Sequence, residues 1–516
     1  MTLLEAAAPP PVRPQRSLLS TIVAATESSA SPTAAPAETG RLERFLNEPT
    51  TGGAIREWLG GPFAGSRDDL ARRLNQDVAA IDRLLNAQLN AILHAPAFQK
   101  LEASWRGLAY VVAQADYEDE PSIKVRVLNV AWRDLERDFE RAIEFDQSQL
   151  FRKVYESEFG SPGGEPFGVL IGDYEIHPRV SREHPHDDVR MVETLAGVAA
   201  AAFCPIILNA SPTLFGLDDF SRLEQRLDHQ RTFEGVDYTK WKSLRAMEDS
   251  RFIGLTLPRV LMRTPYVDDG HRVHGFRFQE DVLGPDRSKY LWGGAGFAFA
   301  SVLMRAFSQA GWLADIRGAR RGIEGGGLVV NLPQHNFATE HPGLATKSST
   351  DVIITEDLEK QLSDLGFISL CESKDTEYSV FYSNQSLQKP AKYDRAAPNT
   401  NSQMSSMLQY MLCVSRFAHY VKVLGRDKIG AFTEYDELEK LLQNWIVNYV
   451  TDDSEATPAV KARYPLRDAK VQVEPTPGKP GSYRCKMHLM PHYELDEMEA
   501  SVRVVAELMP GRTDAR

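Results

Sequence analysis

Cysteine is scarce in this sequence, with 4 residues among 516. None of the four belongs to a Cys-x-x-Cys pair, and none lies at zinc-site spacing from a histidine. Residues 1–40 are rich in Ala, Pro, Ser and Thr, and they lack the charged start and apolar core of a signal peptide. We therefore expect a cytoplasmic protein with reduced, buried thiols at Cys204, Cys371, Cys413 and Cys485.

Long apolar runs and a surplus of basic residues are also missing. The longest apolar run, residues 195–208, is interrupted by Pro205. It is shorter than the about 18–20 residues that a membrane span requires, which argues against direct membrane insertion. The 59 Lys and Arg residues are outnumbered by 71 Asp and Glu residues, giving a formal net charge of -12. This balance argues against nucleic acid as a partner.

Motifs for nucleotide binding are incomplete. Three glycines within Gly293–Gly296 precede an apolar, helix-like run, as they would in a phosphate-cradling loop. The Lys and Ser/Thr that a Walker loop requires are absent, and Phe299 stands where the third glycine of a dinucleotide fingerprint belongs. We interpret the glycines as a close contact between a helix start and a strand, and we expect no cofactor.

Catalytic and metal-binding patterns are equally weak. The segment REHPHDDVRM contains ligand types for a transition metal, at His184, His186, Asp187 and Asp188. Acidic residues also favour a helix N-terminus, so we interpret the segment as a solvated loop that leads into a helix at Asp188. The H-E-x-x-H and G-x-S-x-G motifs are absent, and His335 and His419 are isolated. We expect no metal site, no catalytic residues and no enzymatic activity.

The strongest helical pattern begins at Ser66, which with Asp69 has the spacing of a capping box. Pro96 is expected to end this helix, and a second helix with Trp105 on its apolar side follows. The stripe on the first helix is either part of the core or a surface for a partner. Its apolar residues recur at intervals of three and four, at Leu70, Leu74, Val78, Ile81, Leu85, Leu89 and Ile92.

Strands alternate with helices from about residue 122. β-Branched content predicts strands at 122–130, 167–174, 203–210, 251–257, 327–332 and 351–356. Helices are expected at Trp132–Phe145, Asp188–Ala202 and Phe297–Ala310. The alternation predicts an α/β fold of mixed α+β character, with helices flanking a mixed, partly parallel sheet.

The C-terminal part begins with a long helix closed by Gly425 and another at Thr433–Val450. The segments AKVQVEP and YRCKMHLM flank TPGKPGS and predict a hairpin. The chain then ends in a strand in which apolar residues alternate with polar ones. A terminal strand needs a pairing partner, either its own domain or a neighbouring subunit. The apolar residues of this strand are Val502, Val504, Ala506 and Leu508.

Several segments together resemble the large sheath subunit of bacterial type VI secretion systems, the TssC/VipB type of the EvpB family. The clearest is WKSLRAMEDSRFIGLTLPRVLMRTPY, at Trp241–Tyr266, and the resemblance extends in order over about residues 65–516. Gly294 departs from the pattern, because a small polar residue is expected there. The other matching segments are 101–112, 167–176, 195–223, 290–307, 367–390 and 410–430.

The resemblance implies a mechanical function and a contractile-tail-sheath-like fold. Such a subunit pairs with a small sheath subunit of the TssB/VipA type, and the heterodimers polymerise into a helical tube around stacked Hcp rings on a baseplate. Contraction drives the inner tube and its spike into a target cell, and a ClpV-type AAA+ ATPase disassembles the sheath. On this basis the apolar stripe would face the small subunit, and the terminal strand would link neighbouring subunits.

Composition and the resemblance together suggest a division of the chain into four parts, the first of them from its Ala/Pro/Ser-rich composition. Residues 1–60 are expected to form a disordered tail with short linker helices, and 61–115 a helical hairpin for small-subunit pairing. Residues 116–390 would form the α/β sheath body, and 391–516 an inner-layer domain with the subunit-linking strands. Two alternatives stay open: a sheath protein of a phage tail or other contractile injection machine, and an α/β enzyme with a divergent phosphate loop.

Overall fold

The structure is a computed structural model, and its described residues fall into two compact units. Met1–Glu102 and Pro265–Leu291 belong to the first unit, and Ala103–Thr264 and Trp292–Arg516 to the second. The tail expected to be disordered lies mostly outside the described residues. The residues that the structure describes are 39–114, 123–161, 163–224, 229–268, 270, 275–284, 286–319, 324–337, 347–373, 376, 378–428, 435–453, 455–475, 483–492 and 502–508.

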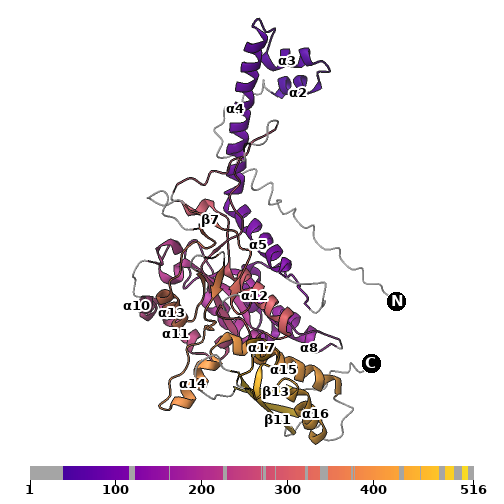
Figure 1. Cartoon of the computed structure of the whole chain (residues 1–516), viewed down its shortest axis with the longest axis vertical. Coiled ribbons are helices and arrows are strands. Elements are labelled where there is room, and N and C mark those ends of the chain that lie inside the picture. The colour runs from indigo at the N-terminus through magenta and orange to yellow at the C-terminus, as the bar shows by residue number, and fades with distance from the viewer. Residues whose placement is uncertain are drawn as a thin grey trace, which may run out of the picture. The chain divides into compact units, whose positions relative to one another are not determined.

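The described residues of the first unit include α2 (Thr39–Asn47), α3 (Thr51–Leu59), α4 (Arg67–Leu93) and the beginning of α5 (Pro96–Ala113). Helices α2 and α3 lie beside one end of α4 (Figure 1). The ring centroids of Phe45 and Trp58 are 5.2 Å apart, and the Trp58 indole N–H donates to Asp77 of α4 at 3.0 Å. These contacts fix the short helices to the long one.

Helix α4 begins as the sequence predicts and ends earlier than expected. The N–H of Asp69 donates to the Ser66 hydroxyl at 3.2 Å, and the N–H of Ser66 donates to the Asp69 carboxylate at 3.1 Å, which completes the capping box. The helix ends at Leu93, and Pro96 opens α5 instead of closing α4. Proline suits a first helical position, because its missing N–H would have no partner there.

The second unit is built on a six-stranded mixed sheet of order β1-β2-β3-β9-β10-β6. Neighbours among the first four strands run parallel, whereas β10 is antiparallel to both β9 and β6. The predicted mixed α/β fold is therefore confirmed. The strands are β1 (Leu170–Ile176), β2 (Ile206–Ala210), β3 (Ile253–Leu257), β6 (Leu328–Val329), β9 (Ile368–Glu372) and β10 (Ser379–Phe381).

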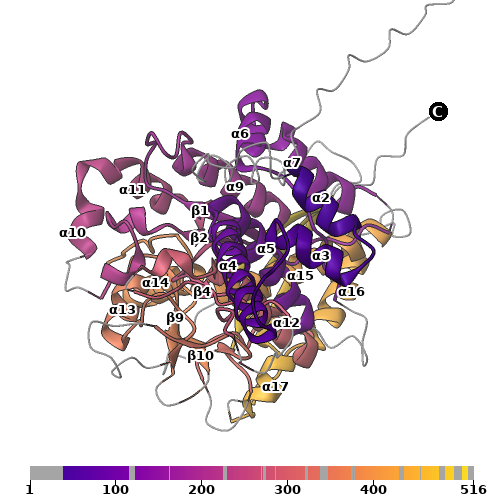
Figure 2. The ribbon, with the colours of Figure 1, turned by 90° about the horizontal axis from the view of Figure 1, so that it is seen from above.

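Helices α9 (Asp188–Ala202) and α12 (Ala295–Ala310) cover opposite faces of this sheet. Side chains alternate between the two faces of a sheet along a strand. In β2, Ile206, Leu208 and Ala210 belong to the core cluster that contains α9, whereas Asn209 faces α12. Helices α6 (Trp132–Arg141) and α7 (Gln149–Phe151) lie beside α9 (Figure 2).

Shorter elements complete the unit. The shorter helices include α8 (Ser157–Phe159), α10 (His229–Glu234), α11 (Thr239–Ala246), α13 (Glu356–Asp364), α14 (Ala396–Ser405) and α17 (Pro458–Arg463). Two-stranded pairs are β4 (Val260–Leu261) with β5 (Trp292–Gly293), and β7 (His335–Asn336) with β8 (Lys347–Ser348). No helix among the described residues is long and apolar enough to cross a membrane.

Three expectations about these elements were wrong. Residues 123–130 and 351–355 form no strand. Val352 and Ile354 are nevertheless buried in the core, so burial and not pairing explains their apolar character. Gly425 lies inside the long helix α15 (Leu408–Lys428) and does not close it, because a helix interior tolerates a single glycine at modest cost.

The C-terminal part is a three-stranded antiparallel sheet packed against α15 and α16 (Tyr435–Val447) (Figure 1). The expected hairpin is present as β11 (Leu466–Pro475) and β12 (Tyr483–Pro491). Residues on one face alternate into a core with the two helices, among them Val471, Val473, Cys485, Met487 and Leu489. All four cysteines are buried free thiols, as predicted.

Candidate interaction surfaces

Helix α4 carries an apolar face that no described segment of the chain covers. None of its residues is buried. Leu84 and Val78 are 72% and 55% exposed. Of the seven predicted stripe residues, Val78, Ile81, Leu85 and Leu89 are exposed, and Leu70, Leu74 and Ile92 are partly buried. The sequence pattern missed Leu84, which lies beside the stripe and became visible only through its exposure.

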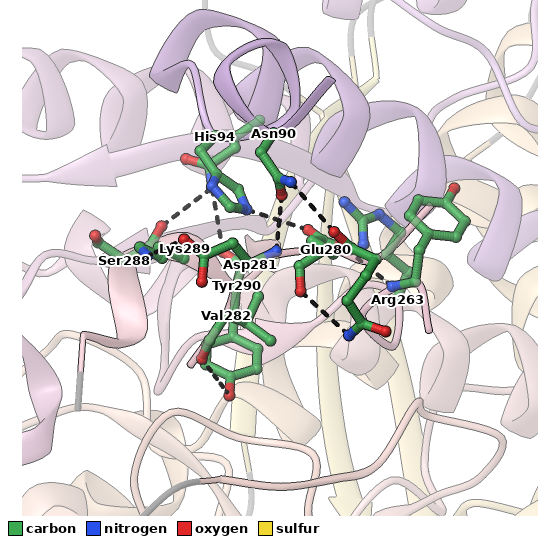
Figure 3. Close-up of polar contacts among 12 residues, drawn as sticks. Asn90, His94, Arg263, Glu280, Asp281, Val282, Ser288, Lys289 and Tyr290 are labelled. Carbon is green, nitrogen blue, oxygen red and sulfur yellow. Dashed lines mark hydrogen bonds and ion pairs between the residues drawn. The ribbon is translucent and has the colours of Figure 1, made fainter. Parts of the chain in front are cut away.

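Residues 277–281, which belong to the same unit, bind along the neighbouring side of α4 (Figure 3). Asn86 donates to the carbonyl of Arg277 and accepts from the N–H of Gln279, both at 3.0 Å. One turn later, Asn90 donates to the carbonyl of Gln279 at 3.2 Å and accepts from the N–H of Asp281 at 2.8 Å. The two amides thus bind the main chain of residues 277–281 much as a neighbouring strand would.

Further polar contacts hold the same segment at the end of α4. The buried Glu280 carboxylate lies 3.4 Å from His94 and accepts from the N–H of Tyr266 at 2.9 Å. Gln99 of α5 donates to the carbonyl of Ser288 at 3.0 Å. Because Asn86 and Asn90 follow Leu85 and Leu89, the segment binds about 100° around the helix from the apolar stripe. Residues 277–281 therefore leave the apolar stripe exposed.

The glycine-rich loop at the start of α12 packs against a side chain of the sheet. The N–H of Gly296 donates to the Asn209 amide oxygen at 3.0 Å, and the Thr256 hydroxyl donates to the same oxygen at 3.0 Å. A Cβ added at Gly294 would lie 2.3 Å from the Asn209 amide group. Asn209 therefore occupies the position at the helix N-terminus where a phosphate would bind.

Replacing Gly294 with alanine tests this packing. The added methyl group would push Asn209 off its two partners, so we expect a loss of about 1–3 kcal/mol in the free energy of unfolding, measured by urea titration. Gly52, which has open space around its Cβ position, supplies the matched control. Equal stability of Gly294→Ala and Gly52→Ala would contradict the close contact.

The predicted histidine and aspartate cluster forms around the first residue of α9. Asp188 is buried, and its carboxylate accepts from the Trp132 indole N–H at 2.7 Å and from the N–H of His177 at 2.8 Å. His184 and His177 lie 2.8 and 3.2 Å from the same carboxylate, with their rings stacked at 3.9 Å. The helix start at Asp188 is confirmed, but this carboxylate is not solvated as expected.

The rest of the cluster forms ordinary surface pairs. His186 lies 2.6 Å from Glu136, and Asp187 accepts from Lys240 at 2.7 Å. His177, His184 and Asp188 could each offer one atom to a transition metal, and these atoms lie within 4.8 Å of one another. Both carboxylate oxygens of Asp188 already accept hydrogen bonds. The arrangement therefore fits a structural network that fixes the N-terminus of α9.

The Asp188 network should be visible in the pH dependence of stability. Burial alone would raise the pKa of Asp188, but hydrogen bonds from His177 and His184 hold this pKa below its ordinary value. The carboxylate therefore contributes stability above about pH 4, and the contribution is lost as the pH falls through the folded-state pKa.

We expect Asp188→Asn to lower the free energy of unfolding by about 3 kcal/mol at pH 7, because it removes the charged centre of a buried network. The difference from the wild type should shrink below about pH 4. Asp187→Asn is the neighbouring control and should cost less than about 1 kcal/mol, since asparagine caps a helix equally well. A difference for Asp188→Asn that does not change with pH would contradict the assignment.

The predicted terminal strand is present as β13 (Val502–Leu508). It pairs with β12 of its own chain in antiparallel register, from Leu489 with Val502 to Tyr483 with Leu508. The sheet order β11-β12-β13 places β13 at the edge, so its outer edge has no strand partner within the described residues. Such an edge can accept or donate a further strand. The link between subunits expected at Val502, Val504, Ala506 and Leu508 stays a prediction.

Known proteins resemble the chain over most of its length. A family model described as EvpB/VC_A0108, tail sheath N-terminal domain, matches residues 75–388, and one described as EvpB/VC_A0108, tail sheath gpW/gp25-like domain, matches 397–508. The type VI secretion system sheath protein TssC1 of Pseudomonas aeruginosa strain PAO1 is 40% identical over 444 residues, which cover 86% of this chain and 87% of that protein.

A solved structure also resembles part of the chain. A chain of the anti-feeding prophage baseplate matches with a TM-score of 0.30 and 11% identity, over 64% of this chain and 67% of its own length. This likeness is too weak to bear on the fold.

Proposed function

The chain belongs to the EvpB/VC_A0108 tail-sheath family and is a structural subunit of a type VI secretion contractile sheath; from this premise we propose how it assembles. It pairs with a small sheath subunit of the TssB/VipA type. The heterodimers then polymerise into a helical tube around the Hcp inner tube, on a baseplate, and contraction propels the inner tube and spike into a target cell.

The observation that carries the pairing is the uncovered apolar face of α4. Five large apolar side chains are exposed on one long helix. Soluble proteins rarely leave such a continuous stripe in water, and an amphipathic helix of a partner would bury it at intervals of three and four residues. Its neighbouring side is already filled by residues 277–281.

Polymerisation requires a contact that does not close on itself. The outer edge of β13 supports such a contact, because it offers main-chain hydrogen bonds to a strand of a different surface on the next subunit. A heterologous contact repeated with a rotation that does not close generates a helical filament. In this proposal β13 links successive subunits while they rotate during contraction.

The chain would act without chemistry of its own. The loop that resembles a phosphate site is filled by Asn209, and Asp188 and its histidines bind one another. We propose that the extended lattice stores the energy of contraction in the cytoplasm, and that a ClpV-type AAA+ ATPase disassembles the contracted sheath.

Co-expression with the small subunit, followed by negative-stain electron microscopy, tests the proposal. We expect hollow tubes that disappear when the small subunit is omitted. Tubes formed by this chain alone would favour a self-sufficient sheath of the phage-tail kind. A discrete particle under both conditions would contradict the assembly mechanism.

A further inference from the structure

Residues 123–130 have the sequence of a strand, but no strand among the described residues pairs with them. The segment IKVRVLNV alternates apolar and polar residues at its start, which predicts a β-strand. Within the described part of the chain, the N–H and C=O groups of residues 124–129 form no hydrogen bond with other protein groups. Val125, Val127 and Leu128 are exposed, Val127 at 67%.

Side chains nevertheless hold this segment against the rest of the second unit. Lys124 pairs with Glu165 at 2.7 Å, and Arg126 pairs with Glu158 at 2.6 Å. At the two ends, Ile123 packs against the cluster of Val111 and Met304, and the carbonyl of Val130 accepts from the Tyr174 hydroxyl at 2.6 Å. The anchors are side chains or end groups, so no described group of the chain occupies the main chain between them.

A groove beside the end of this segment has a positive rim. Leu128 and Val130 line it together with residues of α6, of α7 and of the segments that follow each of these helices. Its volume is about 710 Å³. Its two carboxylates are already engaged: Asp138 accepts from the N–H groups of Gln149 and Leu150, at 2.9 and 3.1 Å, and Asp134 pairs with Arg137 at 3.6 Å.

Three further cations of the groove have no carboxylate partner among the described residues. They are Arg141, Arg152 and Lys153, and all three are exposed. Unpaired cations around an apolar groove favour a ligand with carboxylates.

We propose that residues 124–129 accept a β-strand of the small sheath subunit, and that acidic side chains beside this strand bind Arg141, Arg152 and Lys153. The inference rests on the proposed pairing with a small subunit and adds a second contact to the one at α4. Main-chain hydrogen bonds would supply affinity, and the alternating exposed valines would set the register.

A second copy of this segment is a poorer occupant. Antiparallel self-pairing would bring two sets of the same cations together, and like charges across an interface cost several kcal/mol. The α5 helix next to the segment also exposes Trp105 and Val112 on the face opposite Ala103, Gly107 and Val111, which are buried. A partner that covered this outward apolar face would lie beside residues 124–129.

Hydrogen exchange of the full chain, alone and in complex with the small subunit, tests the proposal. The amides of residues 124–129 should exchange rapidly in the free chain and become protected by at least about 100-fold in the complex. A complex that forms with these amides unprotected overturns the inference and leaves the proposed function intact. Failure of any complex to form contradicts the proposed function itself. If the amides of residues 124–129 become protected as the concentration of this chain alone rises, a second copy pairs with them, and the inference is overturned.

Two proline variants provide a test of geometry. Successive N–H groups of a strand point to opposite edges, so a strand added on one side depends on only one of two adjacent donors. Of Val127→Pro and Leu128→Pro, we expect the variant whose lost N–H faces the added strand to bind the small subunit at least about 10-fold more weakly than the other. Equal affinities of the two variants, whether retained or lost, would overturn the proposal.

Charge variants test the acidic side chains. Arg152→Glu should weaken binding, and its effect should diminish at high salt. Arg133 is exposed on α6 and does not line the groove, so Arg133→Glu is the matched control. Equal effects of the two substitutions would contradict the role of the groove.

Discussion

The double substitution Leu84→Glu with Leu85→Glu is expected to abolish co-purification with the small sheath subunit. Both side chains are exposed on α4, so the folded chain should tolerate glutamate there. In the complex, each substitution would remove a buried apolar group and place a charge in an apolar interface. A combined loss of at least about 4 kcal/mol is expected, which corresponds to an affinity lower by about 1,000-fold.

The matched control adds the same charge to the opposite side of the helix. Gln76→Glu with Arg83→Gln also changes the net charge by two units, and both positions are exposed. This variant should retain the complex, and circular dichroism should show the same helix content for both proteins. A normal yield of complex from the Leu84 and Leu85 variant would show that the apolar face of α4 has another role.

Val504→Pro is expected to eliminate long sheaths while leaving heterodimers intact. Proline removes the N–H of residue 504, and β13 pairs with β12 at this position, opposite Met487. The ladder of an already short strand would lose a donor, and the outer edge would no longer present a regular strand to the next subunit. Size-exclusion chromatography measures the heterodimer, and electron microscopy measures sheath length.

Val504→Thr is the control, because threonine keeps the donor and has a high strand propensity. It should assemble into sheaths of normal length. Normal sheaths from Val504→Pro would mean that β13 serves only its own domain. These two outcomes separate pairing within the chain from pairing between chains.

The sequence was most informative where a local pattern has a local cause. The capping box at Ser66 and Asp69, the start of α9 at Asp188 and the hairpin of β11 and β12 all depend on neighbours in the chain. The sequence also predicted the mixed α/β fold, because alternating strands and helices restrict the possible architectures. Family membership followed from a long colinear series of segments and is confirmed by the comparisons.

Other features depended on residues distant in sequence, and the pattern could not reveal them. Asn209 fills the glycine loop from 87 positions away. Residues 277–281 bind α4 from about 190 positions away, through two asparagines that no periodicity singles out. Such contacts join parts of the chain whose positions only the folded structure fixes.

The strand predicted at 122–130 and the stripe on α4 show the same limit. A sequence pattern determines that a segment can form a strand or an amphipathic helix, because side-chain period is a local property. It does not determine which surface covers that segment. Only the tertiary structure showed that the main chain of 124–129 has no hydrogen-bond partner in the described part of the chain and that the stripe is exposed. Both are decided by which other segments pack nearby.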